Sequence, residues 1–157
     1  MLHKIKLENF QSHENTEIEF VDGVNTITGT SDHGKSAIVR AVRLVKENRP
    51  EASAYMSHWA VNEKGSPTKR TGSSLVVKEE DGTLDEISRF RKHNENEYWI
   101  NNQCFTGFGR NTPTDVKEKV NLSDINFQKQ EDSFFLLNAT SGDIMKKINE
   151  YVDLSLI

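Results

Sequence analysis

The sequence predicts an α/β fold in which a strand leads into a glycine-rich loop and this loop opens a helix. Short alternating or β-branched runs within the first 28 residues indicate strands, and residues 29–36 fit the pattern G-x-x-x-x-G-K-[ST]. An amphipathic helical period follows this pattern at once. With 157 residues, the chain has room for about one domain with one core.

The composition indicates a soluble globular domain. Hydrophobic residues make up 34% and charged residues 28% of the chain, and the net charge is −4. A negative chain is not by itself a strong electrostatic binder of nucleic acid, so any DNA contact has to be local or shared with a partner. The single Cys104 can form no internal disulfide, and no apolar run reaches the length of about 18 that a membrane span needs. We therefore expect a cytoplasmic protein with no membrane contact.

The first half of the chain is predicted to alternate strands, the phosphate loop and one helix. Residues 2–8 and 16–20 alternate with the period of two that half-buried strands show, and a turn at Asp22-Gly23 precedes a β-branched strand over residues 24–28. After the loop, apolar residues recur at helical spacing until Pro50, where the helix cannot easily continue. The face expected to be buried carries Ile38, Ala41, Val42 and Val45.

The second half is predicted to hold an antiparallel meander followed by short helices. A polar loop over residues 60–73 precedes short apolar runs from about 74 to 106, joined by Asp-Gly and Asn-Asn turns. Thr112-Pro113 indicates a helix start, residues 125–128 suggest another strand, and Thr140 with Asp143 resembles the capping box of a last helix.

The glycine pattern has a physical reason. A loop that wraps a triphosphate needs inward backbone N–H groups with no side chain in the way, and a helix whose positive end meets the charge. Lys35 is expected to reach the β- and γ-phosphates, and the Ser36 hydroxyl to help hold Mg²⁺. An ordinary glycine-rich turn is the competing interpretation. The residues expected to contact the nucleotide are Gly29, Thr30, Ser31, Asp32, His33, Gly34, Lys35 and Ser36.

Two residues inside the loop are unusual. Asp32 places a carboxylate beside a polyanion, so we expect its side chain to turn outward to solvent. His33 is interpreted as an exposed loop residue without a role, and a pH-sensitive phosphate contact is the alternative.

Three segments together resemble the amino-terminal lobe of the SbcC, RecF and SMC group of ABC-type ATPases. The opening "IKLENFQSHENTEIEFVDGVNTITG" is similar to that group's first strands, and "ISRFRK" followed by "EYWINN" is similar to its strand-turn-strand. "INFQKQEDSFFLL" resembles its Q-loop, at about residues 125–131. In the loop, Ser31-Asp32 replaces the usual Asn-Gly, and Gln11 replaces a common basic residue. The opening likeness is carried by Asn9, Phe10, Ser12, His13, Phe20, Gly23 and Asn25.

The resemblance implies a P-loop NTPase head of ABC type, of which residues 1–157 form an amino-terminal lobe with a mixed or antiparallel sheet. It implies ATP and Mg²⁺ as cofactors, with Lys35 as a catalytic residue. Gln128, or alternatively Gln130, is the Q-loop residue that reaches Mg²⁺ and the attacking water. Within this group, the sequence resembles SbcC-like proteins of phages and the ATPase subunits of double-strand-break repair nucleases. A bacterial or phage-infected cell is therefore the expected setting.

The family's hydrolysis also needs a signature motif and a Walker B strand, and the sequence holds no acceptable match. Leu75-Val76-Val77 leads into a hairpin turn, Tyr151-Val152-Asp153 is too short, and Thr140-Ser141-Gly142-Asp143 has one glycine where two are expected. The resemblance therefore implies a complementary carboxyl-terminal lobe or second head as partner, a partner nuclease, and DNA contact through the assembled complex. Alone, the chain is expected to hydrolyse ATP slowly or not at all.

Other interpretations stay open at this stage. The chain can instead be a stand-alone truncated homologue that regulates or inhibits a partner ATPase or nuclease. A small P-loop kinase fits less well, because no Arg-rich lid is evident. Cys104 is interpreted as a small core or sheet residue, and Trp59 and Trp99 as packing residues. The scattered histidines predict no zinc site. A basic strip for DNA, or else a solvated face, is formed by Lys64, Lys69, Arg70, Arg89, Arg91 and Lys92.

Overall fold

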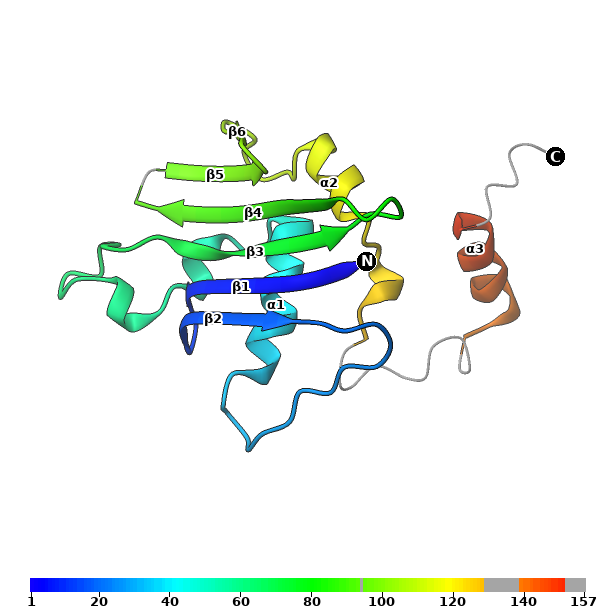
Figure 1. The fold of residues 1–157 in the computed structure, drawn as a ribbon, viewed down its shortest axis with the longest axis horizontal. Coiled ribbons are helices and arrows are strands. Elements are labelled where there is room, and N and C mark those ends of the chain that lie inside the picture. The colour runs from blue at the N-terminus through cyan, green and yellow to red at the C-terminus, as the bar shows by residue number, and fades with distance from the viewer. Residues whose placement is uncertain (94, 129–138, 152–157) are drawn as a thin grey trace. The chain divides into compact units, whose positions relative to one another are not determined.

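The computed structural model describes residues 1–93, 95–128 and 139–151 (Figure 1). It contains two compact units, Met1–Leu122 and Ser123–Ile157. The first unit is a six-stranded antiparallel sheet with helix α1 against one face. This is the α/β fold with an antiparallel sheet that the sequence predicts.

The strands follow the spatial order β2-β1-β3-β4-β5-β6. They are β1 (Leu2–Phe10), β2 (His13–Glu19), β3 (Thr71–Lys78), β4 (Leu84–Lys92), β5 (Glu95–Ile100) and β6 (Gln103–Phe105). The helices of this unit are α1 (Lys35–Glu47), α2 (Thr114–Val120) and the 3-10 turns η1 (Ala52–Tyr55) and η2 (His58–Ala60). The second unit holds the 3-10 turn η3 (Asp124–Asn126) and helix α3 (Ser141–Tyr151).

The core lies between the sheet and α1. Ile5 is paired with Leu75, and Leu75 with Ile87, so these three side chains share one face of the sheet and are fully buried. The predicted apolar face of α1 is buried against them. A polar contact adds to this packing, because the Ser73 hydroxyl donates to the carbonyl of Ala41 at 2.9 Å. The helix that follows the phosphate loop is therefore fixed on the centre of the sheet.

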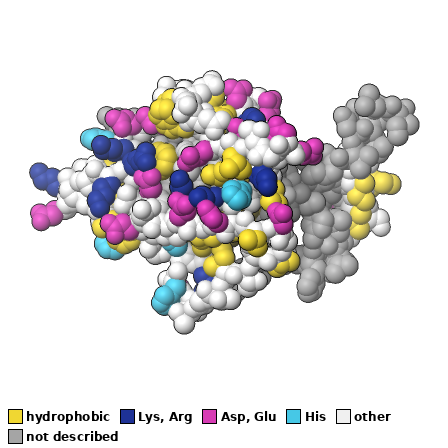
Figure 2. All heavy atoms as spheres, viewed as in Figure 1, with side chains coloured by type: hydrophobic (Ala, Val, Ile, Leu, Met, Phe, Trp, Pro, Cys, Tyr) yellow, Lys and Arg dark blue, Asp and Glu magenta, His cyan; other side chains and the backbone are white. Residues whose placement is uncertain are grey.

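The other side of β1 and β2 is charged. Lys4 pairs with Glu17 and Glu19, each at 2.7 Å, and Lys6 lies 3.8 Å from Glu17. Figure 2 shows basic and acidic side chains interleaved over these strands. Among the described residues, no helix is both long and apolar enough to cross a membrane.

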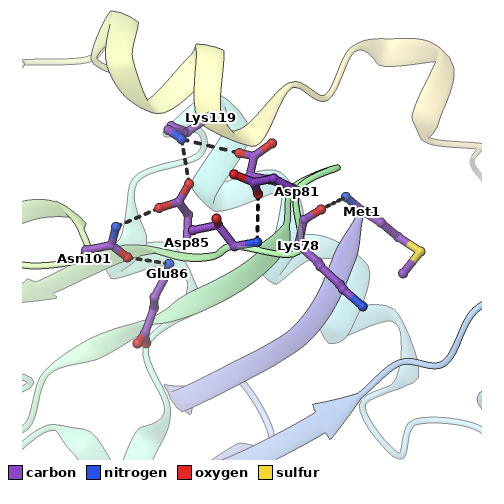
Figure 3. Close-up of polar contacts among 9 residues, drawn as sticks. Met1, Lys78, Asp81, Asp85, Glu86, Asn101 and Lys119 are labelled. Carbon is purple, nitrogen blue, oxygen red and sulfur yellow. Dashed lines mark hydrogen bonds and ion pairs between the residues drawn. The ribbon is translucent and has the colours of Figure 1, made fainter.

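A polar network holds α2 at the start of β4 (Figure 3). Lys119 donates to Asp85 at 2.6 Å and to Glu79 at 3.4 Å. Asp85 is 7% exposed and also accepts from the Asn101 side-chain amide at 2.8 Å. The Lys119 ammonium, together with this amide, holds the pKa of the Asp85 carboxyl below its usual range. The β3–β4 hairpin and α2 are thus joined by side-chain hydrogen bonds and ion pairs.

Two predicted strands are wrong. Residues 24–28 form no strand, and Val24 and Ile27 are 92% and 43% exposed. Their β-branched composition favours a strand, but none of the described strands pairs with this segment, and an unpaired strand is not stable in water. In the second unit, residues 125–128 form no strand either: residues 125 and 126 end the 3-10 turn η3, which Ser123 and Asn126 stabilise through a reciprocal capping box.

The remaining elements agree closely with the prediction. The meander is present as β3 to β6, although β3 starts at Thr71, inside the predicted loop. Leu75-Val76-Val77 lies in β3 and leads into the β3–β4 hairpin, as the sequence predicts. Helix α2 begins directly after Pro113, and α3 begins at Ser141, where the Asp143 N–H donates to the Thr140 hydroxyl at 3.3 Å.

Candidate nucleotide-binding site

The amino terminus of α1 is open to an anion. Gly34 precedes the helix with φ of 83°, no side chain caps the first N–H groups, and the first turn contains no acidic residue. The first N–H groups of a helix have no intrahelical acceptor, and the helix dipole adds positive potential at that end. Such a terminus attracts phosphate. The helix starts at Lys35, where the glycine pattern requires it to start.

Lys35 and Ser36 border a cavity at this terminus. The Lys35 ammonium donates to the carbonyls of Gly29 at 2.8 Å and Thr30 at 2.5 Å. An ammonium has three N–H groups, so one remains for a phosphate oxygen. Ser36 is exposed in the first turn. The cavity has a volume of about 330 Å³ and is lined by Gln11, Ser12, Asp32, Gly34, Lys35, Ser36 and Arg40.

The turn between β1 and β2 supports the loop from one side. His13 Nε2 lies 3.1 Å from the Gly34 carbonyl, and its Nδ1 lies 2.9 Å from the Thr16 hydroxyl. Because a carbonyl only accepts, Nε2 carries the proton, and in the neutral ring Nδ1 accepts from Thr16. A Cβ on Gly34 would come within 2.4 Å of Ser12 Oγ and 2.7 Å of His13 Nε2. Any larger residue at this position would therefore require the Ser12 and His13 side chains to move.

The two unusual loop residues lie at its exposed end. Asp32 is exposed with φ of 62° and is one of the residues that line the cavity, so the outward placement of its carboxylate stays a prediction. His33 is exposed as well, but it contacts other residues of the loop, which the sequence pattern does not indicate. Its Nδ1 lies 2.7 Å from both the Thr30 hydroxyl and the Ser31 carbonyl, so the ring bridges the loop internally.

Arg40 is a cavity residue that the sequence analysis missed. Its Nε donates to Gln11 Oε1 at 2.9 Å, and both side chains line the cavity. Gln11 stands where the family that this chain resembles often has a basic residue. The Arg40 guanidinium thus places a positive charge beside that position. The signal that indicates Arg40 is its spacing, since residue i+4 from Ser36 lies on the same helix face.

The predicted Q-loop residues belong to the second unit. Gln128 is exposed and follows η3 by two residues, while Gln130 lies outside the described residues. The role of Gln128 at Mg²⁺ therefore stays a prediction. In the described ranges, no three or more His, Cys, Asp or Glu side chains gather in a way that could hold a metal ion. For Mg²⁺, the Ser36 hydroxyl and phosphate oxygens are the fitting ligands.

The residues of the predicted basic strip do not form one exposed strip. Arg89 is 1% exposed, so its placement on a solvated surface is wrong. Three others form ion pairs: Lys69 with Glu14, Arg70 with Glu8 and Arg91 with Glu51.

The other residues assigned to packing have mixed outcomes. The indole N–H of Trp59 donates to Asn9 Oδ1 at 3.1 Å, which agrees with a packing role, and that of Trp99 donates to Glu97. Cys104 lies in β6 and is exposed, so of the two alternatives it is a sheet residue and not a core residue.

The antiparallel sheet, the glycine loop and the helix that it opens define a P-loop NTPase fold of ABC type. A family model described as an AAA domain matches residues 4–156. The chain belongs to this family, and the resemblance to the amino-terminal lobe of SbcC, RecF and SMC-type ATPases is confirmed.

Curated relatives match over short segments. The Methanopyrus kandleri protein "DNA double-strand break repair Rad50 ATPase" is 41% identical over 44 residues, which are 28% of this chain and 5% of the relative. "Structural maintenance of chromosomes protein 6A" of Arabidopsis thaliana is 59% identical over 39 residues, which are 25% of this chain and 4% of the relative. The chain thus spans only a small part of the length of these relatives.

Solved structures show the same fold. A structure reported as "Structural biochemistry of ATP-driven dimerization and DNA stimulated activation of SMC ATPases" has a TM-score of 0.61 at 21% identity and covers 94% of this chain and 90% of that one. The recombination mediator protein RecF, in a structure named RecF-ATPrS, has a TM-score of 0.55 at 24% identity and covers 68% of this chain and 28% of that one.

Proposed function

We propose that this chain is the ATP-binding amino-terminal lobe of a DNA repair or recombination ATPase of the SbcC type. The observation that carries the proposal is the uncapped start of α1 at Lys35, beside a cavity of about 330 Å³. The amides of residues 29–34 would surround the β-phosphate, Lys35 would contact the β- and γ-phosphates, and Ser36 would hold Mg²⁺. Gln128 would approach Mg²⁺ and the attacking water from the Q-loop.

A second lobe is part of this proposal. The β-branched segment 24–28 precedes the phosphate loop, is exposed and pairs with no described strand, which favours completion by strands from a partner. That carboxyl-terminal lobe, or a second head, would bring the signature motif and the Walker B carboxylates. The name of the Methanopyrus kandleri relative, a DNA double-strand break repair ATPase, supports DNA as a partner of the assembled complex. The ATP-driven dimerization named for the SMC ATPase structure of the same fold supports a dimeric head. A nuclease partner is part of the proposal that rests on the family resemblance alone.

The chain's own residues account for binding more fully than for hydrolysis. Bound Mg²⁺ would neutralise charge that develops on the phosphates. Lys35 would orient the γ-phosphate, but among the described residues no carboxylate is assigned to position water. Catalysis of phosphoryl transfer depends on that positioning, so steady-state hydrolysis by the isolated chain should stay near the uncatalysed rate.

Titration with a fluorescent ATP analogue and Mg²⁺ tests the binding site. Lys35→Ala removes a charge-assisted hydrogen bond to phosphate, so affinity should fall by about 10- to 100-fold. Lys64→Ala removes an equal charge from the loop before β3 and serves as the matched control. Equal affinities of the two variants, with both folded, would reject the proposed site.

A hydrolysis assay separates the proposal from its alternative, a non-catalytic regulator. The chain is mixed with a carboxyl-terminal lobe of an SbcC-type ATPase, and separately with a complete ATPase of that type. A rate that appears only with the carboxyl-terminal lobe supports the catalytic half. Inhibition of the complete ATPase, without any rate from the mixed lobes, supports the regulator.

A further inference from the structure

A cavity of about 370 Å³ lies at the opposite end of α1 from the phosphate loop. Four of its lining residues are arginines, and they come from three separate segments: the chain after α1, strand β4 and the loop before α2. The lining residues are Asn48, Arg49, Pro50, Glu51, Arg89, Arg91, Asn96, Gly109 and Arg110.

The buried arginine of this cavity has no acidic partner among the described residues. Arg89 is 1% exposed, and it donates to Asn48 Oδ1 at 2.8 Å, to the Phe90 carbonyl at 2.6 Å and to Asn96 Oδ1. Its guanidinium carbon also lies 5.0 Å from the ring centre of Tyr98. These groups satisfy its hydrogen bonds but are all neutral. In the described part of the chain no carboxylate forms an ion pair with Arg89, so its buried charge is not neutralised.

The other charges of the cavity increase the imbalance. Glu51 is the one carboxylate among the lining residues, and its Oε2 is 2.7 Å from Arg91 Nη1. Four guanidinium groups against one carboxylate leave an excess of three positive charges. Burial lowers the pKa of Arg89, and the nearby Arg91 acts in the same direction. Arg49 and Arg110 are exposed at the rim and form no ion pair among the described residues.

We propose that this arginine cavity is a second oxyanion site, which binds a phosphate group. A guanidinium presents two parallel N–H groups that match two phosphate oxygens, and an anion here would neutralise the excess charge around Arg89. The phosphate can be a free phosphate or pyrophosphate ion, or a phosphodiester of a nucleic-acid backbone. The 13-residue helix α1 separates this site from the phosphate loop, so it does not depend on the proposed nucleotide site.

The test uses the full chain carrying Lys35→Ala, which weakens phosphate binding at the loop. In this background, Arg49→Gln with Arg110→Gln removes two rim charges without touching the buried Arg89. Lys64→Gln with Lys117→Gln removes two exposed charges elsewhere and is the matched control. Pyrophosphate is titrated calorimetrically at constant ionic strength. The rim variant should bind it about 10-fold or more weaker than the control.

A labelled DNA duplex distinguishes the two sources of phosphate. If a phosphodiester occupies the site, the rim variant should lower the slope of log affinity against log salt by about 2, while the control leaves it unchanged. If the rim variant binds pyrophosphate more weakly than the control, the site binds a free ion. If the two differ only in the salt dependence of duplex binding, the site binds a nucleic-acid backbone. If the rim variant and the control agree in both titrations, the site does not exist.

Discussion

The two ends of α1 differ in which groups form hydrogen bonds with the unpaired backbone N–H and C=O groups of the helix. At the carboxyl end, Asn48 adopts a left-handed conformation with φ of 54°, and its N–H donates to the Leu44 carbonyl at 2.9 Å. The Tyr98 hydroxyl donates to the Val45 carbonyl, and the Thr112 hydroxyl to the Lys46 carbonyl, each at 2.9 Å. At the amino end, Gly34 brings no capping side chain, and residues 21–33 are exposed.

This difference separates stability from binding. Unpaired groups at a buried helix end cost free energy, and at the carboxyl end protein hydroxyls from β5 and from the loop before α2 satisfy them. At the amino end, the unpaired backbone N–H groups must instead form hydrogen bonds with solvent or with a ligand. Changes at the carboxyl end should therefore alter the free energy of unfolding, and changes at the amino end should mainly alter nucleotide affinity.

The largest effect is expected from ionising Tyr98 at the carboxyl end. Its side chain is 0% exposed, and burial raises the pKa of its hydroxyl to about 12. The unfolded value is about 10, so the folded state favours the neutral phenol. The corresponding stability is fully present below pH of about 10 and is lost as the pH rises toward 12. The loss amounts to about 2–3 kcal/mol, which urea denaturation between pH 8 and 12 can measure.

Tyr98→Phe isolates this effect. The variant should lose about 1 kcal/mol at pH 8, because the carbonyls of Leu44 and Val45 lose a donor. Its unfolding free energy should then change less between pH 10 and 12 than that of the parent. The same slope in parent and variant would show that Tyr98 does not titrate with the proposed shift.

At the amino end, Gly34→Ala should have the next largest effect. An alanine at positive φ costs about 1–2 kcal/mol, and at Gly34 its Cβ also meets Ser12 and His13. Gly23 has φ of 97° with no atom within 4 Å of a Cβ, so Gly23→Ala is the matched control. Both variants should lose stability, but only Gly34→Ala should also weaken binding of an ATP analogue, by about 10-fold or more.

The comparison between these glycines decides what the β1–β2 turn does. If Gly23→Ala and Gly34→Ala lower nucleotide affinity equally, then loop strain alone matters. In that case the contact of Ser12 and His13 with the helix start does not shape the site.

Local patterns made much of the fold predictable. The alternation in β1, the apolar period of α1 and the turn residues of the meander each act within a few neighbouring residues, and the structure contains these elements. The start of α1 was predictable for the same reason, since the glycine pattern itself defines it. The segment 24–28 failed because a strand depends on a partner that its own residues do not encode.

Long-range contacts were not predictable from one sequence. The burial of Arg89 depends on Asn48, 41 residues earlier in the chain, and on the ring of Tyr98. Similarly, Gln11 and Arg40 meet across 29 residues. A charged residue on a strand or an exposed helix face is usually solvated, so neither position carries a local signal of its contact. Only the packing of the sheet on α1 brings these residues together.

The smallest predicted effect concerns Arg40 at the amino end of α1. The guanidinium lines the cavity beside Lys35 and Ser36, and Gln11 holds its Nε. Arg40→Gln removes one positive charge near the phosphates, so affinity for an ATP analogue should fall by about 5- to 10-fold. Its thermal midpoint should stay that of the parent, because the side chain is exposed and forms no ion pair among the described residues.

Arg40→Lys sharpens this prediction, because it keeps the charge but loses the planar fork that Gln11 holds. If the charge alone matters, Arg40→Lys should bind the analogue with the affinity of the parent. If the orientation set by Gln11 matters, Arg40→Lys and Gln11→Ala should weaken binding alike. Parental affinity in Arg40→Gln would instead show that this arginine borders the cavity without contacting the nucleotide, and that Lys35 is the main cation of the amino end.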